Sequence, residues 1–208
     1  MSNPDIYKTI REPASGQYRD RGSKFIGLAF PVTTEEQIRQ HLALLRKQYH
    51  DAHHHCYAWA LGADRSRYRV NDDGEPSGSA GKPIYGQILS ENLSDLLIVV
   101  IRYFGGTKLG IPGLIRAYRT AAGEALSKAQ VINRTVTVTL QIRCSYPMLN
   151  EVMHLIRENN LDISENNFQD ECVLTVEVRK SLAEETLAKF NERYGITIRQ
   201  VAPSTVNG

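Results

Sequence analysis

Two polar stretches of the sequence contain side chains that could do chemistry. The first, "HHHC" (residues 53–56), offers imidazoles and a thiol, which could ligate a metal or form a Cys–His nucleophile. The second, "NDDGEPSGSAGKP" (residues 71–83), offers Asp72, Asp73 and Glu75, which could coordinate magnesium or act as acid and base. Both stretches must be weighed against plainer structural roles.

The plainer roles are favoured in each stretch. In a strand, His53 and His55 share one face while His54 and Cys56 share the other, so a tetrahedral zinc site would need two more ligands from elsewhere. Acids in a loop rich in Gly, Pro and Ser are more often turn formers that accept hydrogen bonds from backbone amides. We therefore expect packed or surface-binding histidines, an ordered acidic loop held against "HHHCYAW" by such bonds, and no bound metal or cofactor.

A third stretch, "RYFGGTKLGIPGLIRAY", which begins at Arg102, is rich in glycine and basic, and it predicts an anion-binding turn. Gly105 and Gly106 follow an apolar run, and the residues after them begin a helix whose free amides and dipole favour an anion. The basic candidates for phosphate contacts are Arg102, Lys108, Arg116, Arg119 and, from the acidic loop, Lys82. Alternatively, the glycines only make a tight turn, the arginines are solvated, and Arg102 pairs with an acid such as Asp72 or Asp73.

Neither common nucleotide-binding motif is present. A P-loop needs a glycine five residues before Gly81, where the sequence has Pro76, and it needs a hydroxyl where Pro83 stands. The dinucleotide fingerprint GxGxxG also fails in "GGTKLGIPG", whose glycines are spaced differently. The glycine-rich turn is therefore not predicted to be a nucleotide site of either kind.

Composition indicates a soluble protein with reduced thiols. The chain has 208 residues, of which 41% are hydrophobic, enough for a sizeable core. No apolar run approaches the roughly 20 residues that cross a bilayer, and three widely spaced cysteines do not make a disulfide framework. We therefore expect a cytoplasmic protein with no membrane partner.

The net charge of the sequence changes sign at Thr135. Residues 1–134 carry 18 Lys and Arg against 13 Asp and Glu, hence +5, whereas residues 135–208 carry 7 against 10, hence −3; the two parts sum to +2. This asymmetry predicts two domains, 1–134 and 135–208. The basic first domain indicates an anionic partner, although ordinary solubilising charge would explain it equally well.

Periodicity predicts alternating strands and helices in the first domain. The expected strands are residues 23–30, as the first of the chain, then 53–62, 67–70 and 96–104. The expected helices are residues 33–49, 84–93 and 113–130. Thr33 with Glu36 indicates a capping box at the start of the first helix.

The pattern changes after Asn133 and predicts a second small domain. "TVTVTLQIR", from Thr135, alternates strictly, with apolar side chains on one face and Thr and Gln on the other. The order that follows is β-α-β-β-α-β, with Ser181 capping the last helix, which predicts a ferredoxin-like α+β domain with both helices on one face. The opposite sheet face is expected to expose Thr137, Thr139, Gln141, Thr175 and Thr197.

The sequence also resembles a known family. "SKFIG", "HHHCYAW", "DDGEPSGSAGKP" and "VIRYFGGTKLGIPGLIRAY", in this order and spacing, are similar to the motifs of the IMPACT family, including its bacterial YigZ-type members. The resemblance covers residues 23–122, and the rest of the chain resembles the small C-terminal domain of the bacterial members. The motif residues that it marks are His54, His55, Asp72, Asp73, Glu75, Gly105 and Gly106.

The resemblance implies an α+β fold of two domains. The first would be like domain IV of elongation factor G, which has the ribosomal protein S5 domain 2-like fold, and the second like its ferredoxin-like domain V. Pro112 departs from the family pattern, which usually has glycine there. Because proline lacks an N–H donor, we expect anion contacts to come from side chains more than from the backbone.

Three functions remain open. The resemblance implies association with the ribosome, tRNA or other RNA, and we favour a non-enzymatic RNA- or ribosome-associated protein that acts in translation or its regulation through the basic surface. The first alternative is a hydrolase or phosphotransferase that uses the DDGEPSG loop and the HHHC strand. The second is a protein-binding regulator that uses the threonine-rich sheet face of the second domain.

Overall fold

The computed structural model describes residues 5–201, which form two compact units. Tyr7–Arg134 form the larger unit, and the described residues from Thr135 onward form the smaller unit together with Asp5 and Ile6. Both units combine helices with antiparallel sheets. Within the described part of the chain, no helix has the length and apolar character that crossing a bilayer requires.

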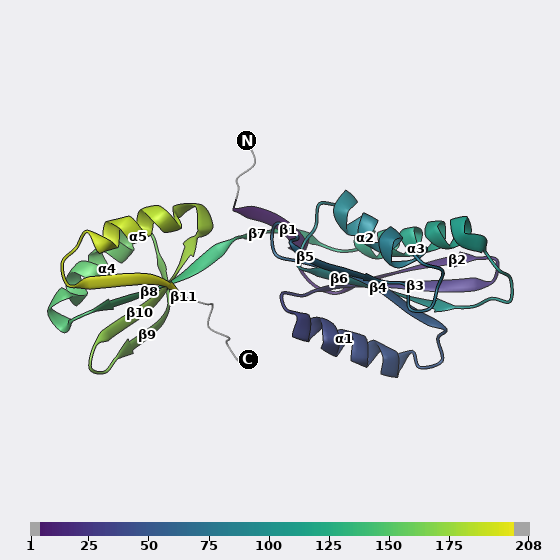
Figure 1. Ribbon diagram of the computed structural model, residues 1–208, viewed down its shortest axis with the longest axis horizontal. Coiled ribbons are helices and arrows are strands. Elements are labelled where there is room, and N and C mark those ends of the chain that lie inside the picture. Colours follow the sequence, from purple (N-terminus) through teal and green to yellow (C-terminus); the bar gives the residue numbers. More distant parts are fainter. Residues whose placement is uncertain (1–4, 202–208) are drawn as a thin grey trace. The chain divides into compact units, whose positions relative to one another are not determined.

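The larger unit is built on a five-stranded antiparallel sheet with the strand order β2-β3-β6-β4-β5 (Figure 1). Its strands are β2 (Ala14–Asp20), β3 (Ser23–Pro31), β4 (His54–Leu61), β5 (Arg67–Asn71) and β6 (Leu96–Tyr103). The central strand β6 is apolar along nearly its whole length because both of its faces are covered. Its alternate residues belong to two separate cores: Leu97, Val99 and Ile101 lie on one face, and Leu96, Ile98 and Val100 on the other.

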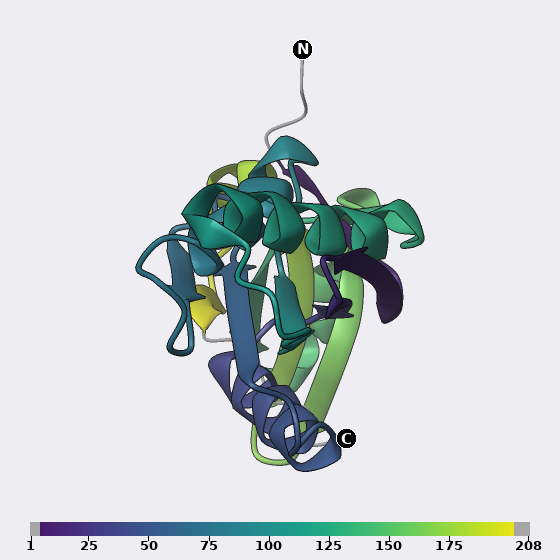
Figure 2. The same cartoon turned by 90° about the vertical axis from the view of Figure 1, so that its right-hand side faces the viewer.

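Helices cover both faces of this sheet. Helix α1 (Glu35–Gln48) lies on one face, and α2 (Gly81–Ser90) and α3 (Gly110–Ser127) lie on the other. Figure 2 shows α3 crossing the sheet on the face opposite α1. The apolar residues at helical spacing predict a buried stripe on each helix, and these residues are buried in the cores or pack against them: Ile38, Leu42 and Leu45 of α1 with its C-cap Tyr49, and Leu114, Tyr118, Ala122 and Ala125 of α3 with Ala129 just after its end.

Helix α1 begins one residue later than predicted. Thr34 rather than Thr33 is the N-cap, and its Oγ1 accepts from the backbone N–H of Gln37 at 3.2 Å. Gln37 Oε1 in turn accepts from the backbone N–H of Thr33 at 2.8 Å, while Glu36 pairs with Arg39. The Thr34 bond is that of a capping box, but the Gln37 side chain bonds to Thr33, the residue before the N-cap, and not to the N-cap itself.

The strand predicted at residues 23–30 is confirmed as β3, but its predicted place as the first strand is wrong, because β1 (Ile6–Ile10) and β2 precede it. β1 pairs with β7 (Val131–Thr135) in a separate two-stranded sheet. β2 is an edge strand with little apolar alternation. A Cβ at its Gly16 would lie 2.4 Å from the carbonyl carbon of Glu124 in α3, so close approach of the helix requires glycine there.

The smaller unit is a four-stranded antiparallel sheet with the order β11-β8-β10-β9. Its elements are β8 (Thr137–Cys144), α4 (Leu149–Glu158), β9 (Asp162–Phe168), β10 (Cys172–Arg179), α5 (Ala183–Asn191) and β11 (Ile196–Val201), with one-turn 3₁₀ helices at Tyr146–Met148 and Lys180–Leu182. Val152 of α4 and Phe190 of α5 belong to the same core as Leu140 and Ile142 of β8, so both helices lie on one face. The predicted β-α-β-β-α-β order is confirmed.

Two predicted element starts in the smaller unit are wrong. The strand expected from Thr135 begins at Thr137, because Val136 lies between β7 and β8 and donates its N–H to the Asp5 carbonyl. Ser181 does not cap α5; its N–H and hydroxyl both bond to the Asp5 carboxylate. Both differences trace to a segment near the start of the chain that local patterns cannot place.

The sheet face of the smaller unit that was predicted to be exposed has fewer exposed threonines than expected. Thr139 and Thr175 are buried, because they lie on the two central strands, β8 and β10, among longer side chains. The Thr139 hydroxyl donates to Glu177 Oε1 at 2.8 Å, directly across the strand pair. The other predicted members remain accessible: Thr137 and Thr197 are exposed, and Gln141 is half-buried.

Candidate functional site

The acidic loop and the histidine strand are joined by hydrogen bonds at the start of β4. Asp73 Oδ2 accepts from the backbone N–H of His55 at 2.6 Å, and the Asp73 carbonyl accepts from Nδ1 of His54 at 2.8 Å. The Cys56 thiol donates to the Asp72 carbonyl at 3.0 Å. The prediction that this loop is ordered and held against "HHHCYAW" is therefore confirmed.

Asp72 organises the rest of the loop. Its Oδ1 accepts from the backbone N–H groups of Ala80 at 3.0 Å and Gly81 at 2.8 Å, and its Oδ2 accepts from Gly78 at 2.8 Å. Since Ala80 and Gly81 are the N-cap and first residue of α2, the carboxylate also caps that helix. Burial alone would raise the pKa of Asp72, but these three bonds and the charge of Lys82 hold that pKa below its ordinary value.

Glu75 belongs to a buried polar cluster between the loop and α3. Its Oε1 accepts from Nη1 of Arg102 at 2.6 Å and from the Tyr118 hydroxyl at 2.7 Å. Nε2 of His54 lies 3.9 Å from the same oxygen. The side chains of Glu75 and Arg102 are only 4% and 7% exposed, so this is a buried ion pair.

Arg102 is thus enclosed at the end of β6, unlike the exposed basic candidates. Its guanidinium carbon lies 5.5 Å from the ring centroids of both Phe25 and Phe104. The sequence left open a pairing with one of the loop aspartates, whereas the acid that pairs with it is Glu75. Aromatic rings on the guanidinium and a carboxylate at its edge fix its position.

Tyr118 is the member of the cluster that the sequence did not identify, because it fits the apolar stripe of α3. The available signal was its hydroxyl, since a buried tyrosine usually needs a hydrogen-bond partner. Burial first, and then contacts with Cys56 and Glu75, raise the pKa of Tyr118. It therefore remains protonated and donates to Glu75.

The cysteine and histidines do not have the properties of a nucleophilic site. Burial raises the pKa of the Cys56 thiol, whereas a nucleophilic cysteine needs a lowered pKa. Burial likewise lowers the pKa of His55, which keeps its imidazole neutral. Within residues 5–201, no group of three or more His, Cys, Asp or Glu side chains is arranged to hold a metal ion. The histidine strand and the acids instead hold the loop together.

Gly105 and Gly106 are required for different reasons. A Cβ on Gly105 would lie 1.9 Å from the carbonyl carbon of Gly22 in the β2–β3 turn, and the Gly105 N–H donates to Ser23 Oγ at 3.2 Å. Gly106 has a φ of +85°, which glycine adopts without strain. The first glycine permits close packing and the second a sharp turn before α3.

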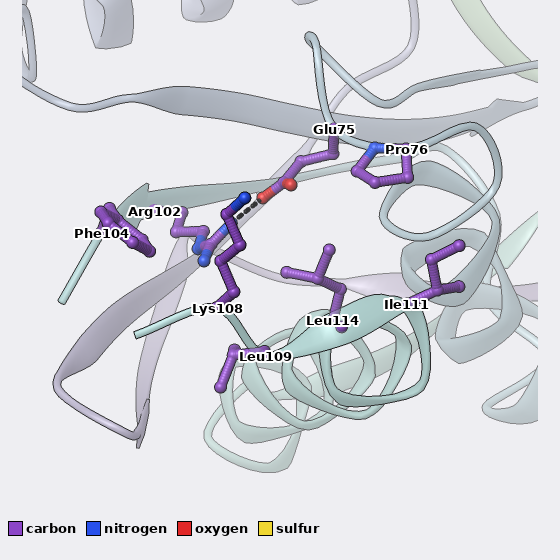
Figure 3. Close-up of a pocket in the computed structure, with 9 residues that line it drawn as sticks. Glu75, Pro76, Arg102, Phe104, Lys108, Leu109, Ile111 and Leu114 are labelled. Carbon is purple, nitrogen blue, oxygen red and sulfur yellow. Dashed lines mark hydrogen bonds and ion pairs between the residues drawn. The ribbon is translucent and has the colours of Figure 1, made fainter. Parts of the chain in front are cut away.

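The acidic loop, the end of β6 and the start of α3 enclose a cavity of about 390 Å³ (Figure 3). Its lining residues include Glu75 and Pro76 from the loop, Arg102 and Phe104 at one end, and Ile111 and Leu114 from α3. Lys108 extends from the glycine-rich turn toward Glu75. The cavity is therefore largely apolar, with a buried ion pair at one end and an exposed lysine beside it.

The basic candidates lie in separate places. Lys108 is exposed and lines the cavity. Lys82 and Arg119 are exposed and line a second hollow of about 540 Å³ between α2 and α3. Arg116 is also exposed, but its Nη2 donates to Asp20 Oδ2 at 3.2 Å, and this bond is the main cause of its raised pKa. Lys108, Lys82 and Arg119 are accordingly the better placed for an added anion.

Comparison with known proteins gives matches over both units. The profile of the Impact N-terminal domain matches residues 21–126, and that of a domain of unknown function (DUF1949) matches residues 142–195. The chain is 32% identical to the "IMPACT family member YvyE" of Bacillus subtilis (strain 168), covering 89% of this chain and 84% of that protein. It is 31% identical to the "IMPACT family member YigZ" of Escherichia coli (strain K12), covering 81% and 83%. A crystal structure of a hypothetical protein matches with a TM-score of 0.73 at 27% identity, covering 96% of this chain and 98% of that one.

Proposed function

Because the chain belongs to the IMPACT family, we propose that it is a non-enzymatic RNA- or ribosome-associated protein with a role in translation or its regulation. Its phosphate contacts are the exposed side chains of Lys82, Lys108 and Arg119. In this proposal the domains are residues 1–134 and 135–208, although Asp5 and Ile6 group with the smaller unit. The first has the ribosomal protein S5 domain 2-like fold of domain IV of elongation factor G, and the second resembles its domain V. The β-α-β-β-α-β order of the smaller unit supports the ferredoxin-like assignment.

One observation carries the functional proposal: the acids of the loop accept structural hydrogen bonds, whereas the basic side chains proposed to contact phosphate are exposed. Both carboxylate oxygens of Asp72 accept backbone bonds, and Glu75 accepts from Arg102 and Tyr118. A catalytic acid or base must exchange protons with a substrate, which would break the bonds that hold this loop. The exposed Lys82, Lys108 and Arg119 make none of these hydrogen bonds, which favours binding of an anionic partner over chemistry.

The two alternatives have less support. A hydrolase or phosphotransferase would need the loop acids, which the structure uses as hydrogen-bond acceptors for the backbone and for Arg102. A protein-binding regulator would use the threonine face, from which burial removes Thr139 and Thr175. Binding through the basic side chains of the larger unit requires neither the release of the loop acids from their hydrogen bonds nor the exposure of buried threonines.

The test is binding to structured RNA and to purified ribosomes across a salt series. Replacing Lys82, Lys108 and Arg119 together by alanine removes three positive charges. Because phosphate binding releases condensed counterions, each lost contact should flatten the log–log salt dependence by roughly one unit or slightly less. Affinity should fall for all RNA sequences alike, since phosphate contacts carry no base information.

The matched control removes the same charge from another face. Arg39 and Lys47 of α1 and Arg67 of β5 are exposed, and α1 covers the face of the sheet opposite α2 and α3. Their triple alanine variant should keep the wild-type salt slope. The proposal is overturned if both variants change the slope equally, or if the Lys82, Lys108 and Arg119 variant leaves it unchanged.

A further inference from the structure

The cavity beside Lys108 has the character of a small-ligand site. Its volume of about 390 Å³ falls in the lower part of the range of ligand pockets, roughly 300–1,000 Å³. Two of its large apolar residues, Phe104 and Ile111, remain 41% and 53% exposed. Large apolar side chains left open at a hollow mark a surface that a partner can cover.

The polar end of the cavity offers a donor and an acceptor side by side. Both hydrogen bonds to Glu75, from Arg102 and Tyr118, end on Oε1. Arg102 donates from Nη1 to Glu75, and its Nε, which has no hydrogen-bond partner within residues 5–201, is enclosed, so any donor to a ligand comes from the Nη groups. Since a guanidinium has five N–H donors and a carboxylate about four acceptor sites, this ion pair has hydrogen-bonding capacity to spare.

We propose that this cavity holds one unstacked nucleobase of the bound RNA, with the attached phosphate at Lys108. A nucleobase has flat apolar faces and an edge that carries both donors and acceptors. Proteins bind unpaired RNA bases by stacking them on aromatic rings or guanidinium planes and by bonding to their edges. Here Phe104 at one end of the cavity and Ile111 at the other offer apolar contacts, and the Glu75–Arg102 pair meets the edge (Figure 3).

Two further observations favour a base over an apolar peptide side chain. A peptide side chain would fill the apolar walls but leave the donor and acceptor at the polar end unmet. Lys108 also lies at the cavity, where it can bind the phosphate that a nucleotide brings with it. The inference rests on the proposed RNA association and adds a base contact to it.

The test uses Phe104→Ala and two single-stranded RNAs of equal length and charge, one with bases and one with abasic sites throughout. Phe104→Ala should weaken binding of the base-containing RNA by about 5- to 150-fold, the range for loss of one stacked base. It should leave the salt slope and the affinity for abasic RNA unchanged, since it removes no charge. Ile111→Ala should give a smaller loss of the same kind.

Tyr194→Ala is the matched control, because it removes a 98% exposed aromatic ring from the smaller unit. It should bind both RNAs as the wild type does, and thermal unfolding should verify that each variant is folded. The proposal is overturned if Phe104→Ala binds base-containing RNA with wild-type affinity, or if it weakens both RNAs equally.

A second measurement separates this proposal from the proposed function. The wild-type protein is titrated with the four nucleoside 5′-monophosphates and, in parallel, with inorganic phosphate, while NMR follows the ring signals of Phe104. Shifts with nucleotides but not with phosphate support the base site even if no RNA or ribosome binds. Equal shifts with phosphate, or none with any nucleotide, overturn it even if the basic side chains bind RNA.

Discussion

The two loops beside the cavity, residues 71–81 and 105–110, both contain glycines at positive φ, but they differ in how much their own acidic and amide side chains bond to the backbone. In the first, Asn71, Asp72 and Asp73 fix the backbone through side-chain hydrogen bonds. In the second, the glycines fix the path by close packing and a positive φ. Acids that look catalytic in the sequence therefore hold the structure. Lys108 lies on a turn that glycines shape, which leaves its side chain available for binding.

The largest expected effect comes from the buried pair behind the first loop. Glu75→Ala should lower the free energy of unfolding by about 3–5 kcal/mol, because it leaves the Arg102 guanidinium buried without its partner. Urea unfolding followed by the fluorescence of the buried Trp59 measures this loss.

Asp20→Ala is the control for that variant. It breaks the Arg116–Asp20 pair, whose arginine side chain is 64% exposed, and should change stability far less than Glu75→Ala does. Equal losses for the two variants would show that burial does not distinguish these pairs, and that the Glu75–Arg102 pair does not anchor the loop.

A smaller effect separates the two glycines of the second loop. Gly105→Ala should cost about 1–3 kcal/mol or more, because its Cβ would overlap the backbone of Gly22. Gly106→Ala should cost about 1 kcal/mol, since only the positive φ opposes it and open space surrounds its Cβ position. Thermal unfolding of both variants gives the order, and a larger loss at Gly106 would contradict the packing argument.

The capping carboxylate of the first loop predicts a pH dependence. Asp72→Asn should cost about 1–2 kcal/mol at neutral pH, since the amide cannot accept all three backbone bonds. The pKa of Asp72 is lower in the folded protein than its ordinary 3.8, so its ionised form stabilises the fold at neutral pH. That contribution begins to fall near the ordinary value and is lost as the pH drops through the folded-state pKa.

The measurement is the free energy of unfolding of the wild type and Asp72→Asn between pH 7 and pH 2. The difference between the two proteins should be largest at neutral pH and should shrink on acidification below pH 4 or so. A difference that stays constant across this range would mean that the Asp72 charge contributes nothing to holding the loop.

Sequence patterns could predict the parts of this structure that depend on local side-chain order. The apolar stripes of α1 and α3, the buried strand β6 and the β-α-β-β-α-β order all follow from periodicity. β1 and β2 were missed because edge strands bury few side chains and alternate weakly. The contact of the acidic loop with β4 was predictable, since aspartates in turns accept backbone bonds.

The polar cluster could not be predicted in the same way. Its members, Glu75, Arg102 and Tyr118, come from the loop, β6 and α3, and meet only because β6 lies beside β4 with Arg102 opposite His54. That register is set by the packing of the whole sheet rather than by any local pattern. The sequence offered several acids near one arginine without a means of choosing between them.

The smallest expected effect on stability concerns Lys108, which lies on the second loop, residues 105–110. Lys108→Ala should change the free energy of unfolding by no more than about 0.5 kcal/mol, because Lys108 is exposed and glycines shape its turn. The same substitution should flatten the salt dependence of RNA binding by roughly one unit. Figure 3 shows Lys108 extending toward Glu75, so a structural role as a second partner of that acid is the competing explanation. Urea unfolding and RNA binding in a salt series, measured on the same preparation, decide between them. A stability loss comparable to that of Asp72→Asn, with an unchanged salt slope, would make Lys108 part of the loop's support and remove it from the binding surface.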